Sequence, residues 1–177
     1  MIAVVYGIVA LVALQRLVEL WYAQRNTAAL LARGGIEAGR NHYYLIVLLH
    51  LGWLLTIAIA APRPASIVWP WLAFFAVLQV ARIWIVASLG PFWTTRIITL
   101  KDTPLVRRGP YRLMRHPNYL VVALEIAVLP LALREYVVAI VFSLLNAGVL
   151  AWRIREEERT LAPRRILLET PDGARGG

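Results

Sequence analysis

Long apolar stretches take up most of this chain and limit what it can fold into. Crossing the hydrocarbon core of a bilayer takes a helix of about 20 apolar residues. Three stretches reach that length and two are shorter, at residues 2–22, 43–61, 67–89, 119–133 and 136–152. The composition agrees, because 60% of the residues are hydrophobic and 16% are charged, against about 45–50% and about 25% in soluble domains. We therefore predict an all-α integral membrane protein with about five transmembrane helices.

The basic residues are distributed unevenly between the predicted loops. If all five stretches cross, fifteen of the 19 Lys and Arg residues lie on one side, and only Arg63 and Arg134 lie on the other. By the positive-inside rule, the N-terminus is then outside the cell membrane and the C-terminus is cytoplasmic. This asymmetry explains the net charge of +9 without nucleic acid, for which no binding motif is present. No basic segment precedes the first stretch, so we interpret it as a retained helix rather than a signal peptide.

A segment rich in strand-forming residues separates the third and fourth apolar stretches. Residues 93–100 read Trp-Thr-Thr-Arg-Ile-Ile-Thr-Leu, and residues 101–104, Lys-Asp-Thr-Pro, supply a turn. Strands exposed to lipid are not tolerated within the hydrocarbon, so this segment must lie at the interface or be covered by protein. We expect a short hairpin or extended excursion on the cytoplasmic face before the fourth helix.

Residues 109–120, Gly-Pro-Tyr-Arg-Leu-Met-Arg-His-Pro-Asn-Tyr-Leu, place charged groups at the mouth of the fourth stretch. Pro117 suits the first turn of a helix, where its missing N–H costs nothing. Arg115 and His116 then lie at a helix N-terminus, which favours anions, and can bind a carboxylate or phosphate group. The alternative is a basic cluster that only sets the topology.

A second polar cluster, residues 153–161, follows the fifth stretch and reads Arg-Ile-Arg-Glu-Glu-Glu-Arg-Thr-Leu. On a continuing helix, Arg153 and Glu157 are neighbours at i and i+4. A solvated, salt-bridged helix end is the alternative interpretation. However, both clusters fall on the predicted cytoplasmic side, where a basic approach to one helix and an acidic exit from the next would meet. This convergence favours a shared binding site.

Together, these clusters resemble the isoprenylcysteine carboxyl methyltransferase family, whose members are integral membrane enzymes that use S-adenosylmethionine. The resemblance rests on Gly-Pro-Tyr-Arg and Arg-His-Pro-Asn-Tyr at 109–119 and on the Arg and Glu-Glu residues of 153–161. It extends upstream through Leu-Gly at 89–90 and Trp-Thr at 93–94, and more weakly to Arg-Asn at 25–26, Gly35, Glu37 and His-Tyr at 42–43. It therefore covers about three quarters of the chain, to Leu161. The pattern is most similar to a bacterial branch that includes methyltransferases of long-chain phenolic or pyrone lipids. The broader superfamily also contains phospholipid N-methyltransferases.

The resemblance implies a site for S-adenosylmethionine and assigns residues to it. The expected cofactor-binding residues are Tyr111, Arg115, His116, Asn118, Tyr119, Glu157 and Glu158, and the expected catalytic residues are His116, Arg153 and Glu158. The chemistry agrees, because the two glutamates can bind the cofactor's ammonium or ribose hydroxyls, while Arg or His binds its carboxylate. His116 is either the general base or an orienting residue of the cofactor site.

Other features limit the alternatives. The 11 glycines form no G-x-G-x-x-G motif, which excludes the usual nucleotide-binding sheet, and the chain has no cysteine for a thiolate metal site. We expect no metal. Residues 1–161 are predicted to form the methyltransferase domain. Residues 162–177 lack the aromatic residues with which family members close their site, and we expect a partly disordered tail.

Several polar residues interrupt the apolar stretches, among them Arg82, Glu125 and Asn146. Ionisable groups inside a membrane are costly and suggest either function or a buried pair. One hypothesis is that these three line the tunnel of the methyl acceptor, with Glu125 two turns from Asn118 on one helix face. The alternative is a structural ion pair between Arg82 and Glu125.

Three functional hypotheses follow from the sequence. The first is a membrane methyltransferase that acts on an oxygen of a lipophilic or prenylated acceptor, which reaches the site sideways from membrane lipid. The second is a phospholipid N-methyltransferase, with the same cofactor and an amine as nucleophile. The third is a non-enzymatic membrane scaffold. The meeting of the two polar clusters favours the first two.

Overall fold

Five helices make up most of the computed structural model, which describes residues 1–38, 40–62, 64–100, 103 and 106–169. The helices are α1 (Ile2–Ala32), α2 (Arg40–Ala60), α3 (Trp69–Leu89), α4 (Pro117–Ala132) and α5 (Tyr136–Glu169). Two 3-10 turns, η1 (Gly90–Phe92) and η2 (Gly109–Arg112), and two strands, β1 (Ile36–Ala38) and β2 (Ile97–Thr99), complete the described part. The predicted fold class, a helical membrane protein, is confirmed.

Four of the helices, α1, α2, α3 and α5, are long and apolar enough to cross a membrane. The fourth helix is shorter, as the sequence predicted: α4 has 16 residues, or about 24 Å at 1.5 Å per residue. Large apolar side chains cover the outside of the long helices, for example Leu11 at 67% exposure and Ile59 at 84%. Such a surface is stable only against lipid. Whether α4 crosses completely, to give five spans, stays a prediction.

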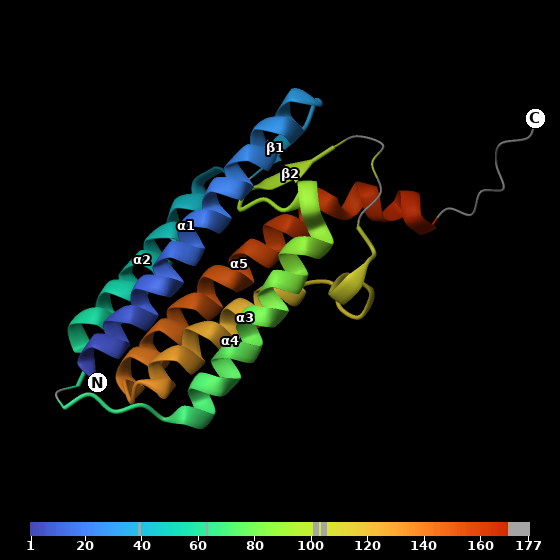
Figure 1. Cartoon of the computed structure of the whole chain (residues 1–177). Coiled ribbons are helices and arrows are strands. Elements are labelled where there is room, and N and C mark those ends of the chain that lie inside the picture. Colours follow the sequence, from blue (N-terminus) through green and yellow to red (C-terminus); the bar gives the residue numbers. More distant parts are fainter. Residues whose placement is uncertain (39, 63, 101–102, 104–105, 170–177) are drawn as a thin grey trace, which may run out of the picture.

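The helices form an elongated bundle with two distinct ends (Figure 1). Along it, α3 packs on α4, α4 on α5, α5 on α2, and α2 on α1. The N-terminus, the α2–α3 connection and the α4–α5 turn lie at one end. The two strands, η2, the beginning of α4 and the last part of α5 gather at the other end, which we call the motif end.

The first helix is longer than predicted, because α1 continues ten residues past Tyr22 to Ala32. Arg25, which follows the predicted end of the first apolar stretch, therefore lies on this helix. Asn26, Thr27 and Leu30 are buried on the extension. The side-chain amide of Asn26 donates hydrogen bonds to the carbonyl oxygens of Gly90, at 3.1 Å, and Trp93, at 2.9 Å. The extension of α1 is therefore packed against the segment that follows α3 and forms part of the motif end.

The extended segment expected before the fourth helix is present as β2. Its partner is β1, far earlier in the chain, in an antiparallel pair that aligns Ile36 with Thr99 and Ala38 with Ile97. An ion pair of 3.2 Å between Arg96 and Glu37 ties the two segments together. Of the turn predicted at 101–104, all but Thr103 lies outside the described residues.

Three local features fix the approach to α4 and its start. Gly109 has a φ of +56°, and a Cβ atom there would overlap the Ser88 hydroxyl, so glycine lets η2 lie against the end of α3. The guanidinium of Arg108 donates to the Ser88 carbonyl oxygen at 2.5 Å. Pro117 occupies the first turn of α4, as predicted.

At the other end of the chain, α5 continues through Arg153 to Glu169. The first part of the tail that we expected at 162–177 is therefore helical. Residues 170–177 lie outside the described part.

Candidate active site

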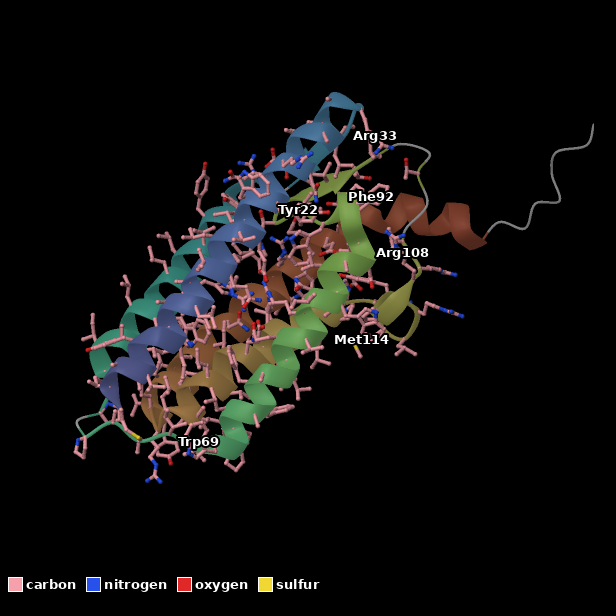
Figure 2. The ribbon with its side chains drawn as sticks, in the orientation of Figure 1. Tyr22, Arg33, Trp69, Phe92, Arg108 and Met114 are labelled. Atoms are coloured by element: carbon pink, nitrogen blue, oxygen red, sulfur yellow. The ribbon has the colours of Figure 1, made fainter. Side chains whose placement is uncertain are left out.

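The two motif clusters predicted from the sequence lie together at the motif end. The first turn of α4 carries one cluster, the continuation of α5 carries the other, and the two helices pack on each other. Figure 2 shows Phe92, Arg108 and Met114 at this end of the bundle and Trp69 at the opposite end.

A hydrogen-bonded network centred on Tyr119 joins the two helices. The Tyr119 hydroxyl donates to Glu157 Oε2 and accepts a hydrogen bond of 2.8 Å from Arg153 Nε. Arg153 also donates from Nη2 to the carbonyl oxygen of Thr95 at 2.7 Å, and its side chain is buried. Hydrogen bonds that involve charged groups are stronger than neutral ones. Arg153 and Glu157, predicted as helix neighbours, are therefore linked through a phenol from α4.

His116 and Glu158 form a second contact beside this network. His116 Nε2 lies 3.5 Å from Glu158 Oε1, and the imidazole stacks on the Tyr119 ring with 5.3 Å between centroids. The Glu158 side chain is 41% exposed and that of His116 is 18% exposed. A carboxylate and an imidazole thus face the open side of the network.

The remaining expected cofactor residues, Tyr111, Asn118 and Arg115, make fewer contacts with this network. Burial raises the pKa of the Tyr111 phenol above its ordinary value, and the Glu157 carboxylate raises it further, so Tyr111 remains a hydrogen-bond donor at neutral pH. The side-chain oxygen of Asn118 is buried without a hydrogen-bond partner among the described residues. Arg115 is exposed and makes no polar contact with the network in the described part of the chain.

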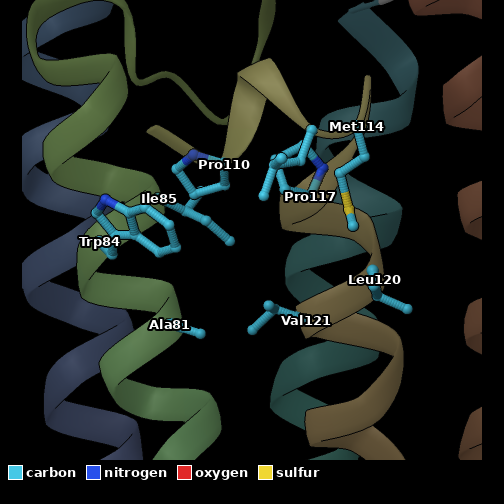
Figure 3. A pocket seen from close by; sticks show the side chains of 9 residues that line it. Ala81, Trp84, Ile85, Pro110, Met114, Pro117, Leu120 and Val121 are labelled. Atoms are coloured by element: carbon cyan, nitrogen blue, oxygen red, sulfur yellow. The ribbon is translucent and has the colours of Figure 1, made fainter. Parts of the chain in front are cut away.

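An apolar groove of about 160 Å³ runs between α3 and α4 next to these residues. Ala81, Trp84 and Ile85 of α3 line one side, and Pro117, Leu120 and Val121 of α4 line the other (Figure 3). Pro110 and Met114, in and after η2, lie at its upper end in Figure 3, and Leu113 also lines it. The groove and the polar network share α4, where Pro117 follows His116 directly; the groove lies between α3 and α4, and the network lies between α4 and α5.

Comparison with known proteins decides the family. The sequence profile of the isoprenylcysteine carboxyl methyltransferase family matches residues 71–163. The chain belongs to this family. The match runs from the first turn of α3 into α5 and so includes the groove and both motif clusters.

Two relatives carry the similarity across most of the chain. YpbQ of Bacillus subtilis, an uncharacterised protein, is 37% identical over 161 residues, which cover 87% of this chain and 94% of YpbQ. An uncharacterised protein of Haemophilus influenzae is 25% identical over 145 residues, or 78% of this chain and 83% of its own. No solved structure matches the chain.

Membership in the isoprenylcysteine carboxyl methyltransferase family confirms the coarser predictions from the sequence. The protein is a methyltransferase of the multi-pass membrane class, and the family implies a lipophilic acceptor.

One buried cluster extends beyond the region that matches the isoprenylcysteine carboxyl methyltransferase profile. Arg82 binds Glu19 through three contacts of 2.6–2.8 Å and Glu125 at 3.0 Å. Arg16 lies 3.0 Å from both carboxylates, and Gln79 donates to Glu125 at 2.8 Å. We call these five residues the ion cluster. It is electrically neutral, and Arg82 and Glu125 are 6% and 2% exposed.

The ion cluster contains two of the three residues expected to line the acceptor tunnel. The contact between Arg82 and Glu125 predicted from the sequence is present. None of the ion pairs or hydrogen bonds of this cluster among the described residues includes Asn146, which is buried on α5. A role of Arg82, Glu125 and Asn146 in lining the acceptor tunnel stays a prediction.

Two further residues of the site were not identified from the sequence. Asn26 holds the chain at Gly90 and Trp93, and the carbonyl oxygen of Thr95 holds Arg153. The signal for Asn26 was the weak family resemblance at residues 25–26, which assigned it no role. No sequence signal exists for a backbone carbonyl.

Proposed function

We propose that this protein is an S-adenosylmethionine-dependent methyltransferase that methylates an oxygen atom at the polar end of a lipophilic acceptor. The observation that carries the proposal is the meeting of His116 and Tyr119, at the start of α4, with Glu157 and Glu158 of α5. Polar groups that converge beside an apolar pocket are typical of small-molecule sites.

The residues present fit the proposed cofactor. S-adenosylmethionine carries an ammonium group, a carboxylate and hydroxyls, and the motif end offers groups of both signs. We assign Glu157 and Glu158 to the ammonium or ribose hydroxyls, and Arg115 and His116 to the carboxylate. The buried Asn118 oxygen has no partner among the described residues and can accept a hydrogen bond from the cofactor. Tyr111 and Tyr119 complete the proposed cofactor set.

The cofactor, when bound, supplies a methyl group on an electrophilic sulfonium. The tasks left to the chain are to align the acceptor and to exclude water. Arg153 is buried between Tyr119 and Thr95, and in the proposed catalytic set it fixes the Tyr119 hydroxyl and thereby Glu157. His116 either removes a proton from the acceptor or orients the cofactor. For the first role, Glu158 at 3.5 Å can stabilise the imidazolium that forms.

The groove supports access of the acceptor from the side of the bilayer. Its walls are apolar and belong to helices whose outer faces suit lipid. Each CH₂ group that it buries stabilises the complex by about 0.8 kcal/mol relative to water. An acceptor whose hydrocarbon chain is already in membrane lipid gains less free energy from this burial. In the proposal, the groove therefore guides the hydrocarbon chain, and the polar end of the acceptor reaches His116. An isoprenylcysteine-like carboxylate and a long-chain phenol or pyrone both fit this description.

Calorimetry on detergent-purified protein tests the cofactor site. We expect S-adenosylmethionine to bind, and Glu157→Gln or Glu158→Gln to weaken binding at least tenfold, or about 1.4 kcal/mol. Glu156→Gln is the matched control, because Glu156 lies on the same helix and pairs with the exposed Arg159. Unchanged affinity in both test variants would overturn the assignment. A product methylated on nitrogen would instead identify a phospholipid N-methyltransferase.

A further inference from the structure

The turn between η2 and α4 exposes two apolar side chains at the motif end. Leu113 is 80% exposed and Met114 is 43% exposed. A single exposed leucine needs no explanation in a soluble protein. Here the exposed surface continues onto Trp84 of α3, at 53%, and Leu120 of α4, at 48%, which line the same groove. The turn therefore extends the lipid-facing surface of the two helices.

Exposed arginines flank these apolar side chains. Arg107 and Arg112 are exposed, and no ion pair or hydrogen bond joins them to another described residue. Nearby arginines are used differently: Arg96 pairs with Glu37, and Arg108 binds the Ser88 carbonyl. Two cations that have no carboxylate partner among the described residues thus lie near an apolar surface at one end of a membrane bundle.

We propose that this turn anchors the motif end to anionic phospholipid. Leu113 and Met114 insert among the acyl chains next to the groove, and Arg107 and Arg112 bind the phosphate groups of the headgroups above them. Long basic side chains reach headgroups while nearby apolar groups stay in the hydrocarbon. Attraction to an anionic surface contributes a factor of about five for each basic residue. The proposal goes beyond methyl transfer, because it assigns a lipid-binding surface to residues that are not in the proposed cofactor set.

The anchored turn has a consequence for the groove. Pro110, Leu113 and Met114 line the groove, so the segment that binds lipid also borders the proposed path of the acceptor. Lipid contact at Leu113 keeps this border within the bilayer rather than in water.

The absence of cysteine from the chain makes a site-specific test straightforward. Leu113→Cys is labelled with an environment-sensitive fluorophore, and the protein is reconstituted into phosphatidylcholine vesicles that contain phosphatidylglycerol. Nitroxide-labelled lipid of either headgroup serves as quencher. We expect quenching at position 113, stronger with labelled phosphatidylglycerol, and little quenching at the control Arg159→Cys, whose native side chain is 77% exposed.

A charge variant tests the arginines. Arg107→Gln/Arg112→Gln, in the Leu113→Cys background, is expected to lower the preference for phosphatidylglycerol at least about fivefold. The control variant Arg25→Gln/Arg33→Gln removes two exposed arginines from the end of α1. We expect it to leave the preference for phosphatidylglycerol at position 113 unchanged.

Either of two results overturns the proposal: a probe at 113 that lipid does not quench, as expected if the turn faces water or a protein partner, or an unchanged preference in the charge variant. Calorimetry with S-adenosylmethionine on the charge variant verifies folding. If the lipid test fails while S-adenosylmethionine still binds, the lipid anchor is refuted and the proposed function is not.

Discussion

The ion cluster gives the most quantitative prediction for this protein. Glu125 receives contacts from Arg82, Arg16 and Gln79, and it is 2% exposed. Glu125→Gln keeps the shape of the side chain and removes its charge. The two arginines then share Glu19 alone, and the buried cluster changes from neutral to a charge of +1.

The magnitude follows from the burial. Removing one partner of a buried ion pair typically costs about 3–5 kcal/mol, because the other charge is left uncompensated. For a domain of this size, each kcal/mol lowers the melting temperature by roughly 2–4 °C, so a loss of about 6–20 °C is expected. Thermal unfolding in one detergent, followed by tryptophan fluorescence, measures the difference.

A neutral double variant provides the control. Arg16→Gln/Glu125→Gln restores the charge balance, and we expect it to recover at least half of the lost stability. A Glu125→Gln protein within about 1 kcal/mol of the wild type would refute a structural role for the pair. If acceptor turnover fell in that stable variant while cofactor affinity stayed unchanged, Glu125 would line the acceptor tunnel instead.

Three further predictions concern topology, pH and the support of the site. A reporter active only in the cytoplasm is expected to give signal when fused after Ala162 and none after Arg63; the reverse would place the motif end outside. Burial raises the pKa of Glu135, in the α4–α5 turn, to about 7 from about 4.5. Stability should therefore fall as the pH rises from about 4.5 to about 7, and Glu135→Gln should remove this dependence in melting experiments. Asn26→Ala removes the side-chain donor to the carbonyl oxygens of Gly90, which keeps the Trp93 N–H, and Trp93; we expect a loss of about 1–3 kcal/mol, and an unchanged melting temperature would contradict it.

Hydropathy predicted the helices well, except where polar residues are buried by tertiary contacts. The first helix was expected to end at Tyr22, because Arg25 and Asn26 follow soon after the apolar stretch. Helix propensity carries the chain on, and Asn26 is satisfied by carbonyl groups of a distant turn. A sequence pattern contains no information about that partner.

Pairing between distant segments was the least predictable part of the fold. The β-branched residues around Ile97 predicted an extended segment, but its partner around Glu37 is only three residues long. So short a strand has no periodicity to detect.

For the candidate site, the sequence indicated which residues belong to it more reliably than which contacts they make. The rule that charges inside a membrane are paired was sufficient to predict the contact between Arg82 and Glu125. The same rule did not predict Glu19 of α1 as the second carboxylate partner of Arg82. Likewise, the motif predicted Arg153 and Glu157, while the phenol of Tyr119 that joins them depends on how α4 packs against α5.

The most direct test of the proposed activity is transfer of a labelled methyl group to lipid. Protein reconstituted with lipid from its native membrane is incubated with S-adenosylmethionine labelled on its methyl group, and the extracted lipid is analysed by mass spectrometry. We expect one labelled lipophilic product, methylated on oxygen, that the wild type and Glu156→Gln form and that His116→Ala and Glu157→Gln do not. Absence of any labelled lipid with the wild type, or equal labelling by all four proteins, would contradict a methyltransferase site at the motif end.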